Sequence, residues 1–430
     1  MKRILRFVVT ILTVAWGRTP VVWLWKKPQT SLELLMQVAS RHYKPGWESG
    51  GLLLLSRLLY FPMLLLWPVR AIIIAAIQFR RYARTTRDKY NVTYMGQLMD
   101  LLSIGLRYWT SPQIYYLFEI YRHRDLARSR TFLLENTMTS LLPYINGSRN
   151  DRHLDEKHVF NRQMKRKGFP VLEDIGLVRD GEIVDVDGNE LQLPCSDIIA
   201  KPDLGLEGRG LTGFRWLGDN RYRSSRGDLL DGEGLRRKLL EMASDEPYLL
   251  QHRSVNHPAL KDLSNGMFCT CRIITGMSPE GEVEVILAVF KMPIGDTVAD
   301  NFGAGGIASP VNLDNGELGR AVYKYTLFEE FDAHPDTGAR INGTRLPHWR
   351  ETMDLVKDAH RQVEGDFPFL GWDIGICDTG PVIVETQATF GFILCERPGL
   401  NGLGTTRFPD LYARWIDNSS YQVVAPALTE

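Results

Sequence analysis

Short β-rich runs that recur after residue 170 are the feature that most constrains the fold of this chain. Two helical patterns interrupt them, at residues 232–243 and 348–363. Turn sequences such as Pro279-Glu280-Gly281 and Asp378-Thr379-Gly380 separate neighbouring runs, as expected for β-hairpins. The mixture predicts an α+β fold with antiparallel sheets. The expected strands are Glu182–Val186, Leu191–Leu193, Asp197–Ala200, Tyr248–Gln251, Phe268–Thr275, Val283–Lys291, Trp372–Cys377 and Val382–Glu385.

The first 150 residues differ from the remainder in charge. They contain 21 Lys and Arg against 7 Asp and Glu, whereas the rest of the chain contains 30 against 44, so the zero net charge hides an asymmetry. A chain of 430 residues exceeds one ordinary core, and two or three domains are expected. A basic and apolar front predicts contact with a membrane surface or with anionic lipid.

The most apolar segment runs from Leu52 to Phe79. Its length could span a bilayer, but Arg57, Pro62 and Pro68 interrupt it. We therefore expect an interfacial or re-entrant hairpin that bends near the two prolines, with the following arginines on the cytoplasmic face. The alternative is a helical hairpin buried against the rest of the protein or against a partner. The arginines are Arg80, Arg81, Arg84 and Arg87.

Cysteine usage and the amino-terminal sequence indicate the compartment. The five cysteines form no CxxC pair and no zinc-type spacing with histidines, which is typical of reduced thiols in a reducing compartment. The start MKRILRFVVTILTVAW is basic and apolar, but no small-residue cleavage site follows, so a signal peptide is not expected. We expect a cytoplasmic protein at the inner face of the cytoplasmic membrane. The run Lys165–Lys167 indicates a solvated helix end, and no nucleic-acid partner is expected.

The stretch KPDLGLEGRG, residues 201–210, combines three glycines with a lysine. It matches neither the P-loop nor the dinucleotide-binding fingerprint, and residues 211–216 have β composition. We therefore expect a loop that joins two strands and closes over its ligand as a flap. The glycines Gly205, Gly208 and Gly210 would let backbone N–H groups turn toward an anion, and Lys201 would add a charge for phosphate. A plain surface turn is the alternative.

The stretch GWDIGICDTGPVIVETQ, residues 371–387, predicts a β-hairpin that carries oxygen ligands. Asp373 and Glu385 lie on its two strands, and Gln387 shares the strand face of Glu385. Mg²⁺ requires such hard oxygen ligands, few of them from protein. A solvated pair of carboxylates is the alternative.

Charged residues also fall inside predicted strands in CRIITG, residues 271–276, and in residues 290–308. Arg272 and Lys291 need either an ion pair or an anionic ligand there. Asn301 and the pair Gly305-Gly306 offer an amide and a flexible backbone that could bind a developing oxyanion.

Together with DEKHVFNRQMKRKGFPV (155–171) and HPDTG (334–338), these motifs resemble the ATP-grasp superfamily, and most closely its sugar-transfer-associated group, which is related to glutamate-ligase-type enzymes. The resemblance covers roughly residues 150–405. It implies two α+β subdomains that grip ATP, 151–250 with the flap and 251–430 with the Mg²⁺ site. An apolar and basic helical region, 1–90, and a second helical region, 91–150, would precede them. The α/β unit that usually comes first in this superfamily is not recognisable before residue 150, which leaves the acceptor site open.

The resemblance implies a nucleotide-binding role for several residues. Lys201 and the three flap glycines would contact the phosphates of ATP. Leu249, Leu250 and Gln251 would form the hinge that receives adenine. Lys157 would be the second nucleotide-binding lysine, although Lys165, Arg166 and Lys167 compete for that assignment.

The resemblance also implies a metal site and catalytic residues. Asp373, Glu385 and Gln387 would hold two Mg²⁺ ions, although the family more often has Asn at the position of Gln387. Arg272, Lys291 and Asn301 would be catalytic, near the transferred phosphoryl group. His334 belongs to the family pattern, and we interpret it as a residue that orders a loop by hydrogen bonding.

The implied reaction is an ATP-dependent ligation of a carboxylate and an amine through an acyl phosphate. The substrates would be small or saccharide-linked, in the tailoring of surface polysaccharide or another envelope metabolite. Two alternatives stay open. One is a kinase that transfers phosphate to a hydroxyl, and the other is a catalytically silent nucleotide-binding scaffold of a glycosyltransferase complex.

Overall fold

The computed structural model describes residues 28–41, 60–134, 141–146, 152–204, 210–295 and 302–417. By its internal contacts the chain divides into two units. Unit 1 joins residues 1–148 to residues 391–430, and unit 2 spans residues 149–390. The division expected from the sequence kept all residues after 250 in one subdomain, whereas the chain returns to unit 1 at Gly391.

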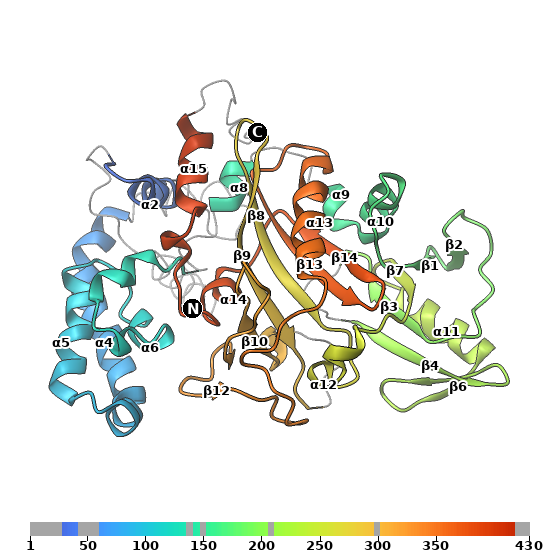
Figure 1. The fold of residues 1–430 in the computed structure, drawn as a ribbon, viewed down its shortest axis with the longest axis horizontal. Helices are drawn as coiled ribbons and strands as arrows, with labels where there is room; N and C mark the ends of the chain where they lie inside the picture. Colours follow the sequence, from blue (N-terminus) through green and yellow to red (C-terminus); the bar gives the residue numbers. More distant parts are fainter. Residues whose placement is uncertain are drawn as a thin grey trace, which may run out of the picture. The chain divides into compact units, whose positions relative to one another are not determined.

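The described part of unit 1 is built from helices (Figure 1). Its first segment contains α2 (Ser31–Arg41), α4 (Tyr60–Tyr90), α5 (Tyr94–Leu106), α6 (Ile114–Leu117), η1 (Ile120–Arg122), η2 (Leu126–Thr131) and α8 (Leu141–Asn146). Its second segment contains α14 (Phe392–Glu396), η5 (Leu403–Thr405) and α15 (Phe408–Asp417). No strand precedes Asp174 within the described residues.

Helix α4 is continuous from Tyr60 to Tyr90, so the hairpin expected near Pro62 and Pro68 is wrong for these residues. Pro62 lies in the first turn, where its missing N–H leaves no helical hydrogen bond unmade. Pro68 removes one internal bond, but contacts with α5 support the helix. Trp67 Nε1 donates to Gly105 O at 2.8 Å, and a Cβ added at Gly105 would lie 2.8 Å from the Cβ of Ala71.

Residues 52–59 of the apolar segment lie outside the described residues, as do residues 1–16, which hold the basic and apolar start of the chain. Among the helices that are described, none is both long and apolar enough to cross a bilayer.

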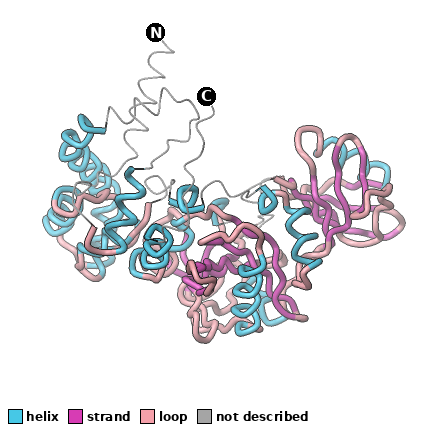
Figure 2. Tube along the Cα trace, turned by 90° about the horizontal axis from the view of Figure 1, so that it is seen from above, coloured by secondary structure: helices cyan, strands magenta, loops and turns pink. Residues whose placement is uncertain are grey.

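Unit 2 contains two antiparallel seven-stranded sheets, which appear as two groups of strands in Figure 2. Sheet 1 has the order β2-β1-β7-β3-β4-β5-β6, and sheet 2 has the order β12-β11-β10-β9-β8-β13-β14. The strands of sheet 1 are β1 (Asp174–Arg179), β2 (Glu182–Asp185), β3 (Ile198–Pro202), β4 (Thr212–Gly218), β5 (Arg221–Ser224), β6 (Leu229–Asp231) and β7 (Tyr248–His252). Those of sheet 2 are β8 (Thr270–Met277), β9 (Val283–Met292), β10 (Ile307–Pro310), β11 (Ala321–Tyr323), β12 (Glu330–Phe331), β13 (Phe369–Cys377) and β14 (Gly380–Gln387).

Unit 2 also contains helices, and α11 packs on sheet 1. Asp231 begins α11 as an N-cap, since its Oδ1 accepts from Gly234 N at 2.7 Å. Leu235 and Leu239 of α11 belong to the same buried cluster as Phe214 and Leu250 of the sheet. The helices are α9 (Arg152–Asp155), α10 (Lys157–Arg166), α11 (Gly232–Met242), η3 (Pro258–Leu260), α12 (Lys261–Ser264), η4 (Phe302–Ala304) and α13 (Trp349–Gln362).

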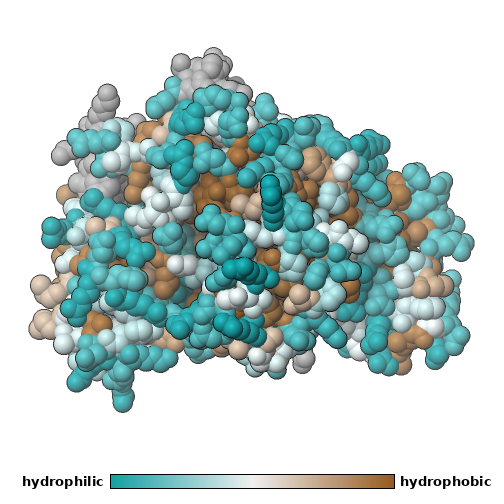
Figure 3. Space-filling model, in the orientation of Figure 1, coloured by the Kyte–Doolittle hydropathy of each residue, from teal (hydrophilic) through white to brown (hydrophobic). Residues whose placement is uncertain are grey.

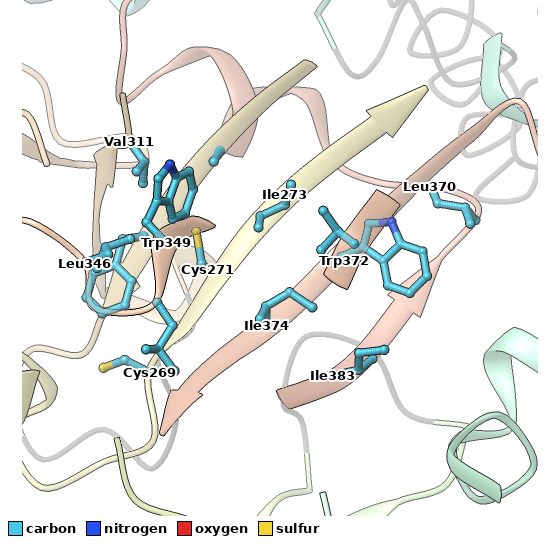
Figure 4. Packing of buried hydrophobic residues seen from close by; sticks show 14 of the residues in the cluster. Cys269, Cys271, Ile273, Val311, Leu346, Trp349, Leu370, Trp372, Ile374 and Ile383 are labelled. Carbon is cyan, nitrogen blue, oxygen red and sulfur yellow. The ribbon is translucent and has the colours of Figure 1, made fainter. Parts of the chain in front are cut away.

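Sheet 2 holds the larger core, part of which is shown in Figure 4. Strand β8 is buried on both faces, which is expected for a central strand covered from both sides. Helix α13 contributes a buried stripe with helical spacing that includes Trp349, Val356 and Ala359. This core fixes β8, β9, β13 and β14, the strands that carry the candidate catalytic and metal-binding residues.

Most of the expected strands are confirmed, as are both helices and both hairpin turns. The strand expected at Leu191–Leu193 is wrong: Glu190 makes only an isolated bridge to Val184 before Pro194 interrupts the chain. The motif at residues 155–171 begins at the last residue of α9, and after Glu156 it contains the whole of α10. The sequence did not reveal β1, β5, β6, β10, β11 or β12.

Candidate active site

The candidate site is centred on three neighbouring strands of sheet 2. Asp373 on β13 lies directly opposite Glu385 on β14, and a bulge follows Asp373. On its other side Asp373 lies opposite Arg272 on β8. Because directly opposed residues of antiparallel strands share a face, the hairpin and β8 bring these three charges together, as the sequence predicted for the two carboxylates.

Asp373 is held by two cations. Its Oδ1 accepts from Arg272 Nε at 2.7 Å, and its Oδ2 accepts from Arg272 Nη2 at 3.0 Å and from Lys291 Nζ at 3.1 Å. All three side chains are buried. Burial raises the pKa of Asp373, but Arg272 and Lys291 outweigh it and hold the pKa well below its usual range. The carboxylate is therefore ionised, and it fixes the position of both cations.

Glu385 is compensated much less. Among the described residues its one hydrogen bond comes from Gln387 Nε2, which donates to Glu385 Oε1 at 3.1 Å. Burial and then the charge of Asp373 raise the pKa of Glu385, while Lys157, Lys201 and Arg272 oppose this effect. A further cation beside Glu385 would relieve both causes of the raised pKa.

These donors fit Mg²⁺. Glu385, Gln387 and Asp373 offer hard oxygen atoms, and the raised pKa of Glu385 reflects a carboxylate that lacks a cation of its own. Within the described ranges no group of three His, Cys, Asp or Glu side chains could hold a metal ion by itself. The few oxygen atoms of Glu385, Gln387 and Asp373 therefore suit an ion that takes its remaining ligands from water and from nucleotide phosphates.

Lys201 lies at the end of β3 and is buried. It has no hydrogen-bond or ion-pair partner among the described residues, although Glu385, Lys157, Asp174 and Asp203 all act on it electrostatically. Burial lowers the pKa of Lys201 to about 8, and the three carboxylates counteract that effect. An anionic ligand is what such a lysine lacks.

Lys157 begins α10 and is also buried, with Nζ donating to Asp203 O at 3.2 Å. The competing residues Lys165, Arg166 and Lys167 are exposed. The charge of Lys157 acts on both Lys201 and Glu385. We name the set Lys157, Lys201, Arg272, Lys291, Asp373 and Glu385 the charge cluster.

Two residues that the sequence analysis did not single out link α10 to β3. His158 Nδ1 lies 2.6 Å from Asp203 Oδ2, and His158 N donates to Asp203 Oδ1 at 2.9 Å. Both residues stand inside motifs that were already recognised, Asp203 two positions after Lys201 and His158 directly after Lys157. This adjacency is the signal that could have found them.

A further carboxylate, Asp174, was also missed. It begins β1, and its Oδ1 accepts from Gln251 Nε2 at 2.6 Å and from Asn161 Nδ2 at 2.9 Å. Burial raises the pKa of Asp174, and these two hydrogen bonds oppose it. Gln251 therefore uses its side chain to hold Asp174. Its neighbours Leu249 and Leu250 are buried on β7, Leu250 in the core of sheet 1.

The flap can be followed at its ends. β3 ends at Pro202 and β4 begins at Thr212, so the glycine-rich stretch joins two paired strands as predicted. Gly205 and Gly208 lie outside the described residues, as does Asn301. Gly210 has a structural reason to be glycine: its φ is 78°, and a Cβ there would lie 2.8 Å from Pro202 Cγ and from Tyr248 Oη.

The HPDTG motif holds the segment that follows Lys291. The buried His334 donates from Nε2 to Pro293 O at 2.8 Å, and Asp336 Oδ2 accepts from Gly295 N at 2.7 Å. The interpretation of His334 as a residue that orders a loop is confirmed.

Solved structures give distant matches. The biotin carboxylase domain of the Hydrogenobacter thermophilus 2-oxoglutarate carboxylase, solved with MgADP, ADP and bicarbonate, is 14% identical, with 61% of this chain and 46% of that chain covered and a TM-score of 0.35. The L-amino acid ligase from Bacillus licheniformis is 11% identical, with 61% and 48% covered and a TM-score of 0.33. The ATP-grasp ligase PsnB with its minimal precursor is 13% identical, with 77% and 75% covered and a TM-score of 0.32. The chain spans about half the length of the first two, and likeness at this level establishes no shared activity.

No curated protein matches the chain in sequence. A family model described as sugar-transfer associated ATP-grasp matches residues 136–407, which is more than half of the chain and encloses the whole charge cluster. Two antiparallel sheets agree with that match, one with a glycine-rich loop between β3 and β4 and the other with the carboxylate hairpin of β13 and β14. The chain therefore belongs to the sugar-transfer-associated ATP-grasp family.

Proposed function

We propose that the chain is an ATP- and Mg²⁺-dependent ligase that joins a carboxylate to an amine through an acyl phosphate. The observation that carries this proposal is the incomplete compensation of the charge cluster. Lys201 is buried without a hydrogen-bond or ion-pair partner among the described residues, and the half-buried Glu385 lies directly opposite another carboxylate, Asp373. Magnesium with a nucleotide triphosphate supplies both missing charges, an anion for the lysine and a cation for the glutamate.

Each part of the cluster has a role in this proposal. Lys157 and Lys201 bind phosphate oxygens of ATP. Glu385, Gln387 and Asp373 hold the metal, which when bound neutralises negative charge on the phosphates. Arg272 and Lys291, both fixed by Asp373, present N–H groups to the oxyanion that develops on the substrate.

The proposed reaction has two steps. An oxygen of the substrate carboxylate attacks the γ-phosphorus of ATP, the bond to ADP breaks, and an acyl phosphate forms. The nitrogen of the amine then attacks the carbonyl carbon, the C–O bond to phosphate breaks, and the nitrogen loses a proton as the amide forms. Water would hydrolyse the acyl phosphate, so the proposed flap has the role of excluding it.

The acceptor that we propose is a saccharide-linked or other envelope carboxylate, used at the cytoplasmic side of the membrane, and the partner that we propose is a glycosyltransferase. The description of the family as sugar-transfer associated supports the substrate class.

The test is release of ADP and phosphate by the purified chain, with pools of carboxylates and amines supplied separately and together. The proposal expects ADP and phosphate in equal amounts only when both pools are present. A phosphorylated product without free phosphate would show a kinase instead. Tight ATP binding with no turnover in any pool would show the silent scaffold. Either result would refute the ligase.

A further inference from the structure

Helix α4 carries an aliphatic stripe on its outer face. Six side chains on this helix are between 41% and 79% exposed. They recur at helical spacing over three turns, and none of them can form a hydrogen bond. We name this set the α4 stripe: Leu65, Leu66, Val69, Ile72, Ile73 and Ile77. A contiguous exposed aliphatic surface of this kind marks an interaction site, whereas single exposed apolar residues are ordinary.

The opposite face of α4 is buried against the other helices of unit 1. Trp67, Ala71, Ala75 and Ala83 are buried in unit 1, and Gln97 Nε2 of α5 donates to Ala83 O at 3.1 Å. The orientation of the helix is therefore fixed by its packing, and the stripe is not a core face that has been displaced. Only one side of α4 is left for a partner.

The carboxyl-terminal half of α4 is strongly basic. Arg80, Arg81, Arg84 and Arg87 are exposed, and the side chain of Arg84 is 90% exposed. No acidic residue occurs between Tyr60 and Arg87, and the first one, Asp88, lies 3.9 Å from Arg84. The outer face thus changes from aliphatic to basic along the helix axis.

We propose that α4 binds the surface of an anionic lipid bilayer. The α4 stripe enters the boundary between headgroups and acyl chains, and the arginines bind lipid phosphates. A bilayer suits this surface because it accepts an aliphatic face without specific hydrogen bonds and attracts basic residues by its negative potential. The buried inner face of α4 makes this an interfacial contact of one helix side.

Neighbouring groups extend the same surface chemistry. Arg87 lies over the ring of Tyr94 at 4.8 Å, and Arg81 lies over the ring of Tyr82 at 5.2 Å. Met95 and Met99 of α5 are 68% and 57% exposed. Elsewhere, the face of the protein in Figure 3 shows apolar patches interspersed among hydrophilic residues. Aromatic rings beside arginines are typical of the bilayer interface, where the apolar part of a tyrosine contacts lipid and its hydroxyl contacts water.

The first test measures binding of the full chain to sedimenting vesicles, without nucleotide. Phosphatidylcholine vesicles are compared with vesicles that also contain phosphatidylglycerol. We expect binding to the anionic vesicles to exceed binding to the neutral ones by at least about tenfold, and to weaken as salt is added. The double variant Val69→Gln/Ile77→Gln should bind about tenfold less tightly. The matched control Leu229→Gln/Val255→Gln removes residues of 66% and 69% exposure from unit 2 and should bind like the original chain.

The second test separates charge from apolar area. Arg80→Gln/Arg84→Gln should reduce binding to anionic vesicles by about tenfold and leave the weak binding to neutral vesicles unchanged. The control Arg215→Gln/Arg223→Gln removes two exposed arginines that face each other on β4 and β5, and it should have no effect.

Three outcomes would overturn the proposal. The chain could fail to bind anionic vesicles at low salt. The Val69→Gln/Ile77→Gln variant could bind as well as its control. Alternatively, the α4 stripe could mediate self-association in solution that Val69→Gln/Ile77→Gln abolishes while vesicle binding persists. Because nucleotide takes no part in these assays, their result is independent of the ligase proposal.

Discussion

Unit 1 and unit 2 each bury a group of charges, but the two groups differ in how completely they are paired. In unit 1, Arg397 Nη2 lies 3.2 Å from Glu119 Oε1, and Arg122 forms a second ion pair with the same carboxylate. Glu396 accepts backbone N–H groups from Leu133 and Leu403. Both glutamates are fully buried, and each is paired inside the unit.

The charge cluster of unit 2 contains both kinds of group. Like Glu119, Asp373 forms ion pairs with two cationic side chains, here Arg272 and Lys291. Lys201 and Glu385 form no ion pair among the described residues, and it is their pKa values that burial shifts against the charged form. The contrast is the basis of our proposal that Lys201 and Glu385 bind a ligand, whereas the unit 1 charges stabilise the fold.

The largest effect on stability is expected from breaking the paired group. Arg397→Met would leave the buried Glu119 short of one cation and lower the free energy of unfolding by about 3–5 kcal/mol. The control Arg407→Met removes an exposed ion pair with Asp410 in the same unit and should cost less than about 1 kcal/mol. Denaturant unfolding followed by circular dichroism measures both. Equal costs would show that burial of this pair is unimportant.

Substitution of Glu385 should affect activity and leave stability intact, the opposite of what we expect for Arg397. Glu385→Gln removes a half-buried carboxylate whose pKa is already raised, so stability should stay the same or increase. ADP release should fall by about 10²–10³ because the metal loses a ligand. Glu241→Gln, at an exposed position on α11, should change neither quantity. A variant Glu385→Gln that is both destabilised and fully active would assign Glu385 to the fold.

A buried histidine in unit 2 has hydrogen-bond partners on both ring nitrogens, and it makes the stability of the fold depend on pH. His360 contacts Thr275 Oγ1 and donates to Phe367 O, and burial lowers its pKa to about 4. In the unfolded chain the pKa of this histidine is near 6.5. As the pH falls, the unfolded state therefore binds the proton before the folded state does. Stability should fall as the pH drops from about 6.5 to about 4, by up to about 1.4 kcal/mol per pH unit.

Unfolding measured between pH 7 and pH 4.5 tests this. The free energy of unfolding should fall less steeply with decreasing pH in His360→Gln. It should fall as in the original chain in His123→Gln, which alters an exposed histidine. If His360→Gln keeps the full slope, other groups cause the acid sensitivity.

The smallest effect concerns the loop after Lys291. His334→Ala removes the hydrogen bond to Pro293 O and should cost about 1 kcal/mol of stability. Because the bond holds a segment close to Lys291, kcat should fall severalfold while the KM for ATP stays constant. His348→Ala is the control, since His348 caps α13 without a side-chain hydrogen bond. A change in KM alone would place His334 at the nucleotide instead.

The sequence predicted those parts of the fold and site that local patterns encode. Asp373 and Glu385 lie on two adjacent strands that one short turn joins, so alternation along a hairpin was enough to bring them together. Arg272 and Lys291 stood out because a charge inside a strand requires a partner. That partner proved to be Asp373, which local spacing could not reveal, since the ion pair joins residues about 100 positions apart in sequence.

The misses have a common physical cause, which is that long-range packing decides them. Asp174 appears as an ordinary polar residue until Gln251 and Asn161 are placed beside it. The prolines of the apolar segment suggested a bend, but packing of Trp67 and Ala71 against Gly105 keeps α4 continuous. Residues 391–417 follow shortly after the β13–β14 hairpin, and only their contacts assign them to unit 1.

The central claim is that the buried Lys201 serves phosphate, and calorimetric binding of MgADP tests it most directly. Lys201→Met should weaken binding by about 10²-fold without loss of thermal stability, because it removes a buried cation that has no hydrogen-bond or ion-pair partner in the described residues. Lys165→Met, at an exposed position on α10, should bind MgADP like the original chain. Unchanged MgADP affinity together with a lowered melting temperature in Lys201→Met would contradict the account.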